Sequence, residues 1–166
     1  MPRRSKSTRR CRMQVWLPPD SEPFIRWVDY QLGSELEHLP HIVLATRRND
    51  EFAAAVLHSF VSDDIELTVA STGPGWASRR FLHAIAYTVF VTNKAKRLTA
   101  YVAASNEPSE RALVKAGFKR EGTKRRAMNG EDVHLYGMLR EECRWLDDRS
   151  ASFSPPLGSE SGLGAA

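Results

Sequence analysis

Asn106 and Ser109 open the segment NEPSERALVKAGFKREG (residues 106–122), and their types and spacing are suited to binding a ligand. The segment has the pattern of a short helix that ends at Gly117. An amide and a hydroxyl in the first turn of such a helix can hydrogen-bond a bound molecule. Asn is also a favoured N-cap residue, and a first-turn Ser often bonds the backbone, so a structural role for both is equally consistent with the pattern.

The loop STGPGWASRR (residues 71–80) holds a second group of residues suited to binding. Gly73 and Gly75 allow close approach of the backbone to a ligand. The helix predicted to follow begins with unpaired N–H groups and a partial positive charge, which the cations Arg79 and Arg80 oppose. A bound anion such as a pyrophosphate would account for the glycines and the arginines together. An ordinary glycine loop with solvated arginines explains them equally well.

An alternating series of helices and strands must position these groups. Apolar residues at helical spacing predict helices over 22–36, 77–91 and 107–116. Short apolar or alternating runs predict strands over 41–46, 51–60, 64–71, 97–105, 118–129 and 133–142. The unit over 64–105 is long enough for a parallel strand–helix–strand crossover, so the sequence predicts a mixed α/β sheet.

The same periodicity predicts which side of each element is buried. In the first helix the apolar face consists of Phe24, Ile25, Val28 and Leu32. In the strand over 64–71, Ile65, Leu67 and Val69 lie on one side and Glu66 and Thr68 on the other. In the second helix the apolar face consists of Phe81, Leu82, Ile85, Val89 and Phe90.

Length and composition indicate one folded domain. The chain has 166 residues, of which 42% are hydrophobic and 27% charged, and these fractions are ordinary for a globular protein. We expect the domain to span residues 13–148. Residues 1–12 are expected to be a disordered basic tail, and the Ser-, Gly- and Pro-rich residues 149–166 a second disordered tail.

Positive charge is concentrated at the start of the chain. Residues 1–12 hold six basic side chains and no acid, whereas the rest of the chain has 18 basic and 20 acidic residues. We therefore expect no nucleic-acid binding beyond weak contact by residues 1–12. No apolar run approaches the ~20 residues of a membrane span. Cys11 and Cys143 lack the spacing of a metal or redox motif. These features predict a cytoplasmic protein with neither a membrane nor a metal partner.

The motif N-x-P-S-x-R…G-F-x-x-E-G, with the glycine loop and the order of elements, resembles the GNAT N-acetyltransferases. The residues that carry the motif are Asn106, Ser109, Gly117, Phe118, Glu121 and Gly122. The closing YGMLREECRWL (residues 136–146) is similar to the last strand of the branch with the ribosomal-protein alanine N-acetyltransferases, of phage and bacterial type. The resemblance covers about residues 14–146 and implies a mostly antiparallel sheet of six to seven strands flanked by helices.

The resemblance implies transfer of an acetyl group from acetyl-CoA to an amine, either a protein N-terminus or a small amine, by direct attack in a ternary complex. Separately from the resemblance, we expect a monomer or a homodimer, and no metal. Pantetheine would lie between the splayed strands over 64–71 and 97–105, where a backbone N–H would polarise the thioester carbonyl. The cofactor-binding residues would be Val69, Ala70, Ser71, Gly75, Trp76, Ala77, Ser78, Arg79, Arg80, Asn106 and Ser109.

Two catalytic roles follow from the same resemblance. Ser109 would face the coenzyme A sulfur. The attacking amine must be neutral, so a group must accept its proton, and Glu66 on the polar side of its strand is the preferred candidate. The alternatives on neighbouring predicted strands are His58, His134 and Tyr136. An exposed strand carboxylate without a catalytic role is an equally good interpretation of Glu66.

Two positions depart from the pattern of the family. Residues 73–77 match its pyrophosphate loop only loosely, since no Arg or Gln leads the glycines. Leu113 occupies the position where many members carry a catalytic tyrosine, although the branch with the serine lacks that tyrosine too. These departures favour an alternative function, a catalytically silent GNAT-fold module that binds acyl-CoA or a partner protein. A nucleic-acid-binding domain is a third hypothesis, which the nearly neutral body of the chain disfavours.

Overall fold

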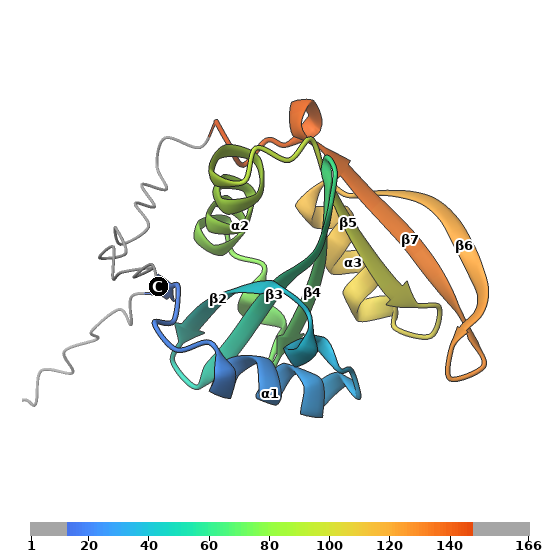
Figure 1. Ribbon diagram of the computed structural model, residues 1–166, viewed down its shortest axis with the longest axis horizontal. Helices are drawn as coiled ribbons and strands as arrows, with labels where there is room; N and C mark the ends of the chain where they lie inside the picture. The colour runs from blue at the N-terminus through green and yellow to red at the C-terminus, as the bar shows by residue number, and fades with distance from the viewer. Residues whose placement is uncertain (1–12, 148–166) are drawn as a thin grey trace, which may run out of the picture.

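The computed structural model describes residues 13–147, which form one seven-stranded sheet with helices on both faces (Figure 1). The strands are β1 (Gln14–Trp16), β2 (His41–Arg48), β3 (Glu51–Val61), β4 (Asp64–Ser71), β5 (Arg97–Ala103), β6 (Lys119–Met128) and β7 (Glu131–Leu139). The α-helices are α1 (Glu22–Leu32), α2 (Arg79–Ala86) and α3 (Glu107–Ala116). Short helices are η1 (Leu36–His38), η2 (Pro74–Trp76), η3 (Tyr87–Thr92) and η4 (Arg140–Glu142). The tails expected at 1–12 and 149–166 lie outside the described residues.

The strands lie in the order β1-β2-β3-β4-β5-β7-β6. Every neighbouring pair is antiparallel except β4 and β5, which are parallel and joined by the crossover through α2. This architecture confirms the predicted mixed, mostly antiparallel sheet. The sequence analysis missed β1, because three residues that pair only with β2 are too few to show a period-two pattern.

Two apolar clusters cover the two faces of the sheet, and α1 and α2 lie on opposite sides of β2–β4 (Figure 1). Successive strand residues point to opposite faces, so Ala53, Ala55 and Leu57 of β3 join the cluster under α2 while Ala54 and Val56 join the cluster under α1. The α2-side cluster is the larger, and it includes the fully buried Phe81 and Phe90. The predicted apolar face of the second helix is therefore correct.

The first helix ends earlier than its pattern predicted. It stops at Leu32, because Gly33 adopts a left-handed backbone with φ of 65° and closes the helix with a hydrogen bond from its N–H to the Asp29 carbonyl oxygen. Ile25 and Val28 are buried as expected. Leu32 was expected in the core and is 48% exposed, so that prediction was wrong. The predicted face ran one turn past the part of the helix that the sheet covers.

The second helix begins at Arg79 and changes at Tyr87 from α-helix to π-helix, which continues to Thr92. The turns are wider there, since a π-helix closes its hydrogen bonds over five residues. Thr88 Oγ1 donates to the Ala84 carbonyl oxygen at 2.9 Å within this region. The wider turns keep Val89 and Phe90 buried in the α2-side cluster.

β6 lies at one edge of the sheet and pairs with β7 alone. Its residues are exposed except for Gly122, which is half-buried, and five of them are basic: Lys119, Arg120, Lys124, Arg125 and Arg126. Its one acid, Glu121, forms an ion pair with Arg97 of β5 across Gly137 of β7. A Cβ atom at position 137 would lie 2.6 Å from the Arg97 guanidinium, so a larger residue there would displace the ends of the two paired side chains.

Candidate functional site

The strands β4 and β5 separate partway along their length. Their parallel pairing runs from Asp64 and Arg97 to Leu67 and Ala100 and stops there. Beyond that point β4 continues to Ser71, paired only with β3, and β5 continues to Ala103, paired only with β7. The two facing strand edges are thus not paired with each other. A strand edge of this kind presents N–H and C=O groups that an extended ligand can use.

Beyond the point where β4 and β5 separate, two of the β4 side chains pack against the core of the protein. Val69 packs against the α2-side cluster, and Ala70 is 3% exposed beneath α1. Ser71 is exposed. The predicted coenzyme contact of Ala70 can therefore come only from its backbone groups, whereas the Val69 side chain is half-buried.

The loop between β4 and α2 holds the predicted pyrophosphate site. Pro74–Trp76 forms a single 3₁₀ turn, and Ser78 caps α2 by accepting a hydrogen bond from the Phe81 N–H at 3.2 Å. Trp76 and Ala77 are half-buried and pack against the α2-side cluster. Their side chains therefore support the loop.

Gly73 and Gly75 lie against the side chain of Glu51. A Cβ atom at position 73 would lie 2.7 Å from Oε1 of Glu51, and one at position 75 would overlap Oε2 of the same carboxylate. A side chain at either position would therefore require the end of the Glu51 side chain, at the start of β3, to move aside. The sequence analysis missed Glu51, because nothing in the pattern of β3 links it to a loop more than twenty residues away.

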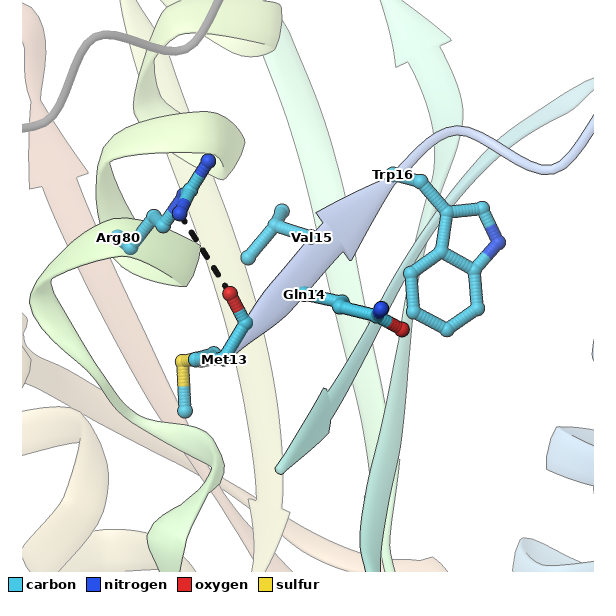
Figure 2. A pocket seen from close by; sticks show the side chains of 5 residues that line it. All are labelled: Met13, Gln14, Val15, Trp16 and Arg80. Atoms are coloured by element: carbon cyan, nitrogen blue, oxygen red, sulfur yellow. Dashed lines mark hydrogen bonds between the residues drawn. The ribbon is translucent and has the colours of Figure 1, made fainter. Parts of the chain in front are cut away.

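The two arginines of the loop differ in their surroundings. Arg79 is exposed, whereas Arg80 is half-buried and donates to the Met13 carbonyl oxygen at 3.5 Å. Figure 2 shows Arg80 facing the residues of β1, with which it lines a depression of about 450 Å³. Met13 also contacts the cap of α2, since Ser78 Oγ donates to its sulfur at 2.6 Å. The start of the described chain is therefore anchored against the N-terminus of α2.

Asn106 and Ser109 occupy the first turn of α3, as predicted. The Asn106 side chain accepts a hydrogen bond from the Ser109 N–H at 3.3 Å and so caps the helix. Gly117 closes the other end in a left-handed conformation with φ of 100°, and Phe118 is buried behind it. The capping interpretation of Asn106 and Gly117 is thus correct. Asn106 is exposed and Ser109 half-buried, so both remain accessible to a ligand.

Replacing Asn106 with alanine should lower the free energy of unfolding by about 1 kcal/mol, within the ~0.5–2 kcal/mol range measured for lost N-caps. The change removes the acceptor of the Ser109 N–H. Ser105→Ala, one residue earlier and also exposed, is the matched control and should be nearly neutral. Urea denaturation of both variants checks this. Equal stabilities would show that the cap is dispensable.

Glu66 lies one residue before the end of the β4–β5 pairing, on the α1 side of the sheet. Its Oε2 lies 3.7 Å from Nδ1 of His58 on β3, and its side chain is 31% exposed. Burial raises the pKa of the Glu66 carboxyl above its ordinary value, while a hydrogen bond with Ser59 partly opposes the rise. Burial also lowers the pKa of His58, whose Nε2 contacts Thr68 Oγ1 at 2.9 Å. A carboxylate with a raised pKa near an opening is suited to accepting protons.

The other two candidate bases lie on the opposite face of the sheet. His134 and Tyr136 pair with Val102 and Ala100 of β5, whose side chains belong to the α2-side cluster. Glu110 of α3 contacts both side chains. The sequence analysis did not select Glu110, because the contact joins residues 24 positions apart through a packing of α3 on β7 that no local pattern indicates.

The Asp29 carboxylate near the end of α1 has a structural role. It accepts hydrogen bonds from Ser34 Oγ, the Leu36 N–H and the Glu37 N–H. It therefore holds the turn between α1 and η1. Within residues 13–147, no group of three or more potential metal ligands is close enough to hold an ion, and no helix is long and apolar enough to cross a membrane.

Comparisons with models of protein families and with curated proteins found no match. Solved structures do match. A variant of spermidine N-acetyltransferase SpeG from Vibrio cholerae is 13% identical with a TM-score of 0.65, over 81% of this chain and 96% of that chain. The same acetyltransferase in complex with CoA and spermine is 13% identical with a TM-score of 0.61, over 78% and 96%. Mycobacterium smegmatis RimJ in complex with CoA-disulfide is 21% identical with a TM-score of 0.54, over 74% and 62%.

Identities this low show the fold alone. The chain therefore has the fold of these N-acetyltransferases, as its resemblance to the GNAT family predicted, and the residues of the site must carry any statement about its reaction.

Proposed function

We propose that the protein transfers an acetyl group from acetyl-CoA to an amine by direct attack of the amine on the thioester. The observation that carries this proposal is the separation of β4 from β5 after Leu67 and Ala100, which leaves two facing strand edges. An extended pantetheine chain carries two amide groups and can hydrogen-bond such an edge as an added strand does. Two structures with the same fold were solved in complex with CoA and with CoA-disulfide, which supports coenzyme A as the ligand.

The groups around the opening suit the proposed reaction. Asn106 and Ser109 lie at the first turn of α3, which follows β5, and the arginine-bearing loop follows β4. Backbone N–H groups at the start of α2 and the cations Arg79 and Arg80 would bind the pyrophosphate. Glu66, whose pKa is raised, would accept the proton of the amine. The acceptor we propose is a protein N-terminus, as in the ribosomal-protein alanine branch, or a small amine.

Native mass spectrometry and an amine-acetylation assay test this proposal together. The full chain should bind acetyl-CoA and should acetylate members of a panel of N-terminal peptides and small polyamines. Acetylated product with a mass increase of one acetyl group supports the proposal. A full chain that binds acetyl-CoA and acetylates no member of the panel would contradict it.

One observation favours the alternative of a catalytically silent module. The Glu51 carboxylate lies against Gly73 and Gly75, so a negative charge adjoins the loop that the pyrophosphate would use. Like charges repel and would weaken binding of the coenzyme there. Binding of acetyl-CoA without acetyl transfer is the result that this alternative predicts.

Replacing Arg79 and Arg80 together with alanine should reduce the rise in melting temperature that acetyl-CoA produces. Ligand binding to the native state alone stabilises it by mass action, and the variant loses two cations beside the pyrophosphate. The variant without ligand should melt within a few degrees of the parent chain, since one arginine is exposed and the other half-buried. The measurement is thermal unfolding with and without acetyl-CoA.

The matched control for this experiment is the double replacement of Arg125 and Arg126, an exposed arginine pair on β6. It removes the same charge from a distant strand and should leave the ligand-induced shift intact. A normal shift in the Arg79 and Arg80 variant would place the pyrophosphate elsewhere.

A further inference from the structure

A β-bulge in β3 lies beside Glu66. The pairing of β3 with β4 sets His58 opposite Glu66 and Val61 opposite Asp64, so between these pairs two residues of β3 face one residue of β4. Ser59, the first of the two, has a φ of 51°, in the left-handed region that glycine usually occupies at such a bulge. Consecutive residues of a regular strand point to opposite faces, and a bulge can redirect one of them. His58 and Ser59 therefore both approach the same carboxylate.

Four polar side chains around this bulge are connected, and we call them the Glu66 network: Thr68, His58, Ser59 and Glu66. The Ser59 hydroxyl hydrogen-bonds the Glu66 carboxylate and lies 2.9 Å from Nδ1 of His58. Nε2 of the same ring lies 2.9 Å from Thr68 Oγ1. Nδ1 and Glu66 Oε2 are 3.7 Å apart, too far for a hydrogen bond, so the serine is the link between the histidine and the carboxylate.

The donors and acceptors of the Glu66 network follow from the chemistry of its groups. An ionised carboxylate only accepts hydrogen bonds, so Ser59 donates its one hydroxyl proton to Glu66. The serine oxygen is then an acceptor for His58, and the ring must carry its proton on Nδ1. Nε2 is unprotonated in that form and accepts from the Thr68 hydroxyl.

The surroundings of His58 favour the neutral ring that this assignment requires. Burial is the largest effect on its pKa and lowers it. Asp29 of α1 raises the pKa and His41 of β2 lowers it, so the two nearby charged or titratable groups oppose each other. A neutral imidazole carries a single proton, and in the Glu66 network that proton lies on Nδ1.

We propose that Ser59 is a positioning residue for the Glu66 carboxylate, and that His58 and Thr68 fix the direction in which its hydroxyl donates. The proposal rests on the proposed function, in which Glu66 accepts the proton of the amine. His58 then acts as a donor to the serine and not as a base, because its second nitrogen is occupied by the Thr68 hydroxyl. The remaining lone pairs of the carboxylate stay open to the amine.

Ser59 also offsets part of the cost of burying Glu66. Burial raises the pKa of the carboxyl, and the hydrogen bond with Ser59 is the largest of the effects that lower it. Of the charged groups nearby, Lys124 of β6 lowers the pKa and Asp64 raises it. The hydroxyl is therefore the main group that favours the ionised carboxylate, the form in which a base acts.

Ser59→Ala and Ser59→Gly test this role together, since both remove the hydroxyl. The rise of kcat/KM with pH should move to higher pH in both variants. On the acidic side of the rise kcat/KM should fall about tenfold, the factor that corresponds to the loss of one ordinary hydrogen bond. Stability should differ between the variants, because glycine adopts the left-handed backbone of position 59 without strain and alanine does not. An equal change in the pH profile therefore separates positioning from a structural effect.

Ser62→Ala is the matched control for these variants. Ser62 is exposed in the turn between β3 and β4 and has a φ of 55°, so it is a second serine with a left-handed backbone. Its replacement should leave the pH profile of kcat/KM as it is in the parent chain.

Two NMR measurements test the Glu66 network independently of activity. The carbon shift of the Glu66 carboxyl should titrate at higher pH in Ser59→Gly than in the parent chain. The nitrogen shifts of the His58 ring in the parent chain should show the proton on Nδ1. A proton on Nε2 would reverse the donors and acceptors of the network and overturn the inference.

The outcomes are distinguishable from those of the proposed function. If the parent chain acetylates an amine and the Ser59 variants keep its pH profile, this inference is overturned while the proposed function stands. If Ser59→Ala fails to fold, Ser59→Gly decides alone. If the parent chain acetylates no amine, the proposed function falls, and an unchanged titration of Glu66 in Ser59→Gly overturns the inference as well.

Discussion

Glu66→Gln is expected to reduce the rate of acetyl transfer by about 10²–10⁴-fold, the range typical of a lost general base. Glutamine has the size of glutamate and cannot accept a proton from the amine. The Kd for acetyl-CoA should change little, because Glu66 lies on the α1 face of the sheet and points away from the α2-side cluster that faces α2 and α3. Turnover and calorimetric titration of acetyl-CoA measure the two effects separately.

The pH dependence of this variant is equally specific. A base acts in its ionised form, so in the parent chain kcat/KM should rise as pH passes through the raised pKa of Glu66. This rise of kcat/KM with pH should be absent in Glu66→Gln. The difference in rate between the variant and the parent chain should shrink at higher pH, where more of the amine is neutral. Glu107→Gln, which removes an exposed carboxylate on α3, is the control. Normal turnover of Glu66→Gln across the pH range would assign the base to another group or to water.

Phe81→Ala is expected to have the largest effect on stability, a loss of about 3–5 kcal/mol in the free energy of unfolding. Phe81 is completely buried in the α2-side cluster, so its truncation leaves a cavity beneath the start of α2. A loss of this size is a large part of the ~5–15 kcal/mol that stabilises a typical domain. Urea denaturation should therefore show a much lower midpoint, and partial unfolding at physiological temperature.

Val114→Ala provides the control for this prediction. Val114 is 59% exposed on α3, and its truncation should change stability by less than about 0.5 kcal/mol. If Phe81→Ala cost no more than Val114→Ala, the α2-side cluster would not be the core that stabilises this fold.

Local patterns predicted most of the fold correctly. The alternation of β4, the glycine that ends α3 and the apolar face of α2 each depend on a few neighbouring residues, and each is present in the structure. Where burial depends on distant elements, the prediction failed. Leu32 follows the helical period of Ile25 and Val28, yet the sheet does not extend beneath it. The strand β1 exists only because β2 pairs with it.

In the candidate site, too, features set by neighbouring residues were predictable and contacts between distant elements were not. The positions of Glu66, Asn106 and Ser109 follow from the periods of β4 and α3 and were predictable. The contacts of Glu51 with the glycine loop, and of Glu110 with His134 and Tyr136, were not, since each joins elements that meet only in the folded sheet. The point at which β4 and β5 part is a property of their register, and neither strand shows it in its own sequence.

The basic edge strand β6 also affects whether the sheets of two copies of this chain can pair edge to edge. A bare strand edge is a template on which a second sheet can add itself, at a spacing of ~4.8 Å. Two β6 strands brought together at that spacing would set rows of lysine and arginine against each other, and facing like charges destabilise such pairing. The charges of β6 therefore oppose edge-to-edge aggregation of the sheet. Since salt screens exposed charges, this protection weakens as ionic strength rises.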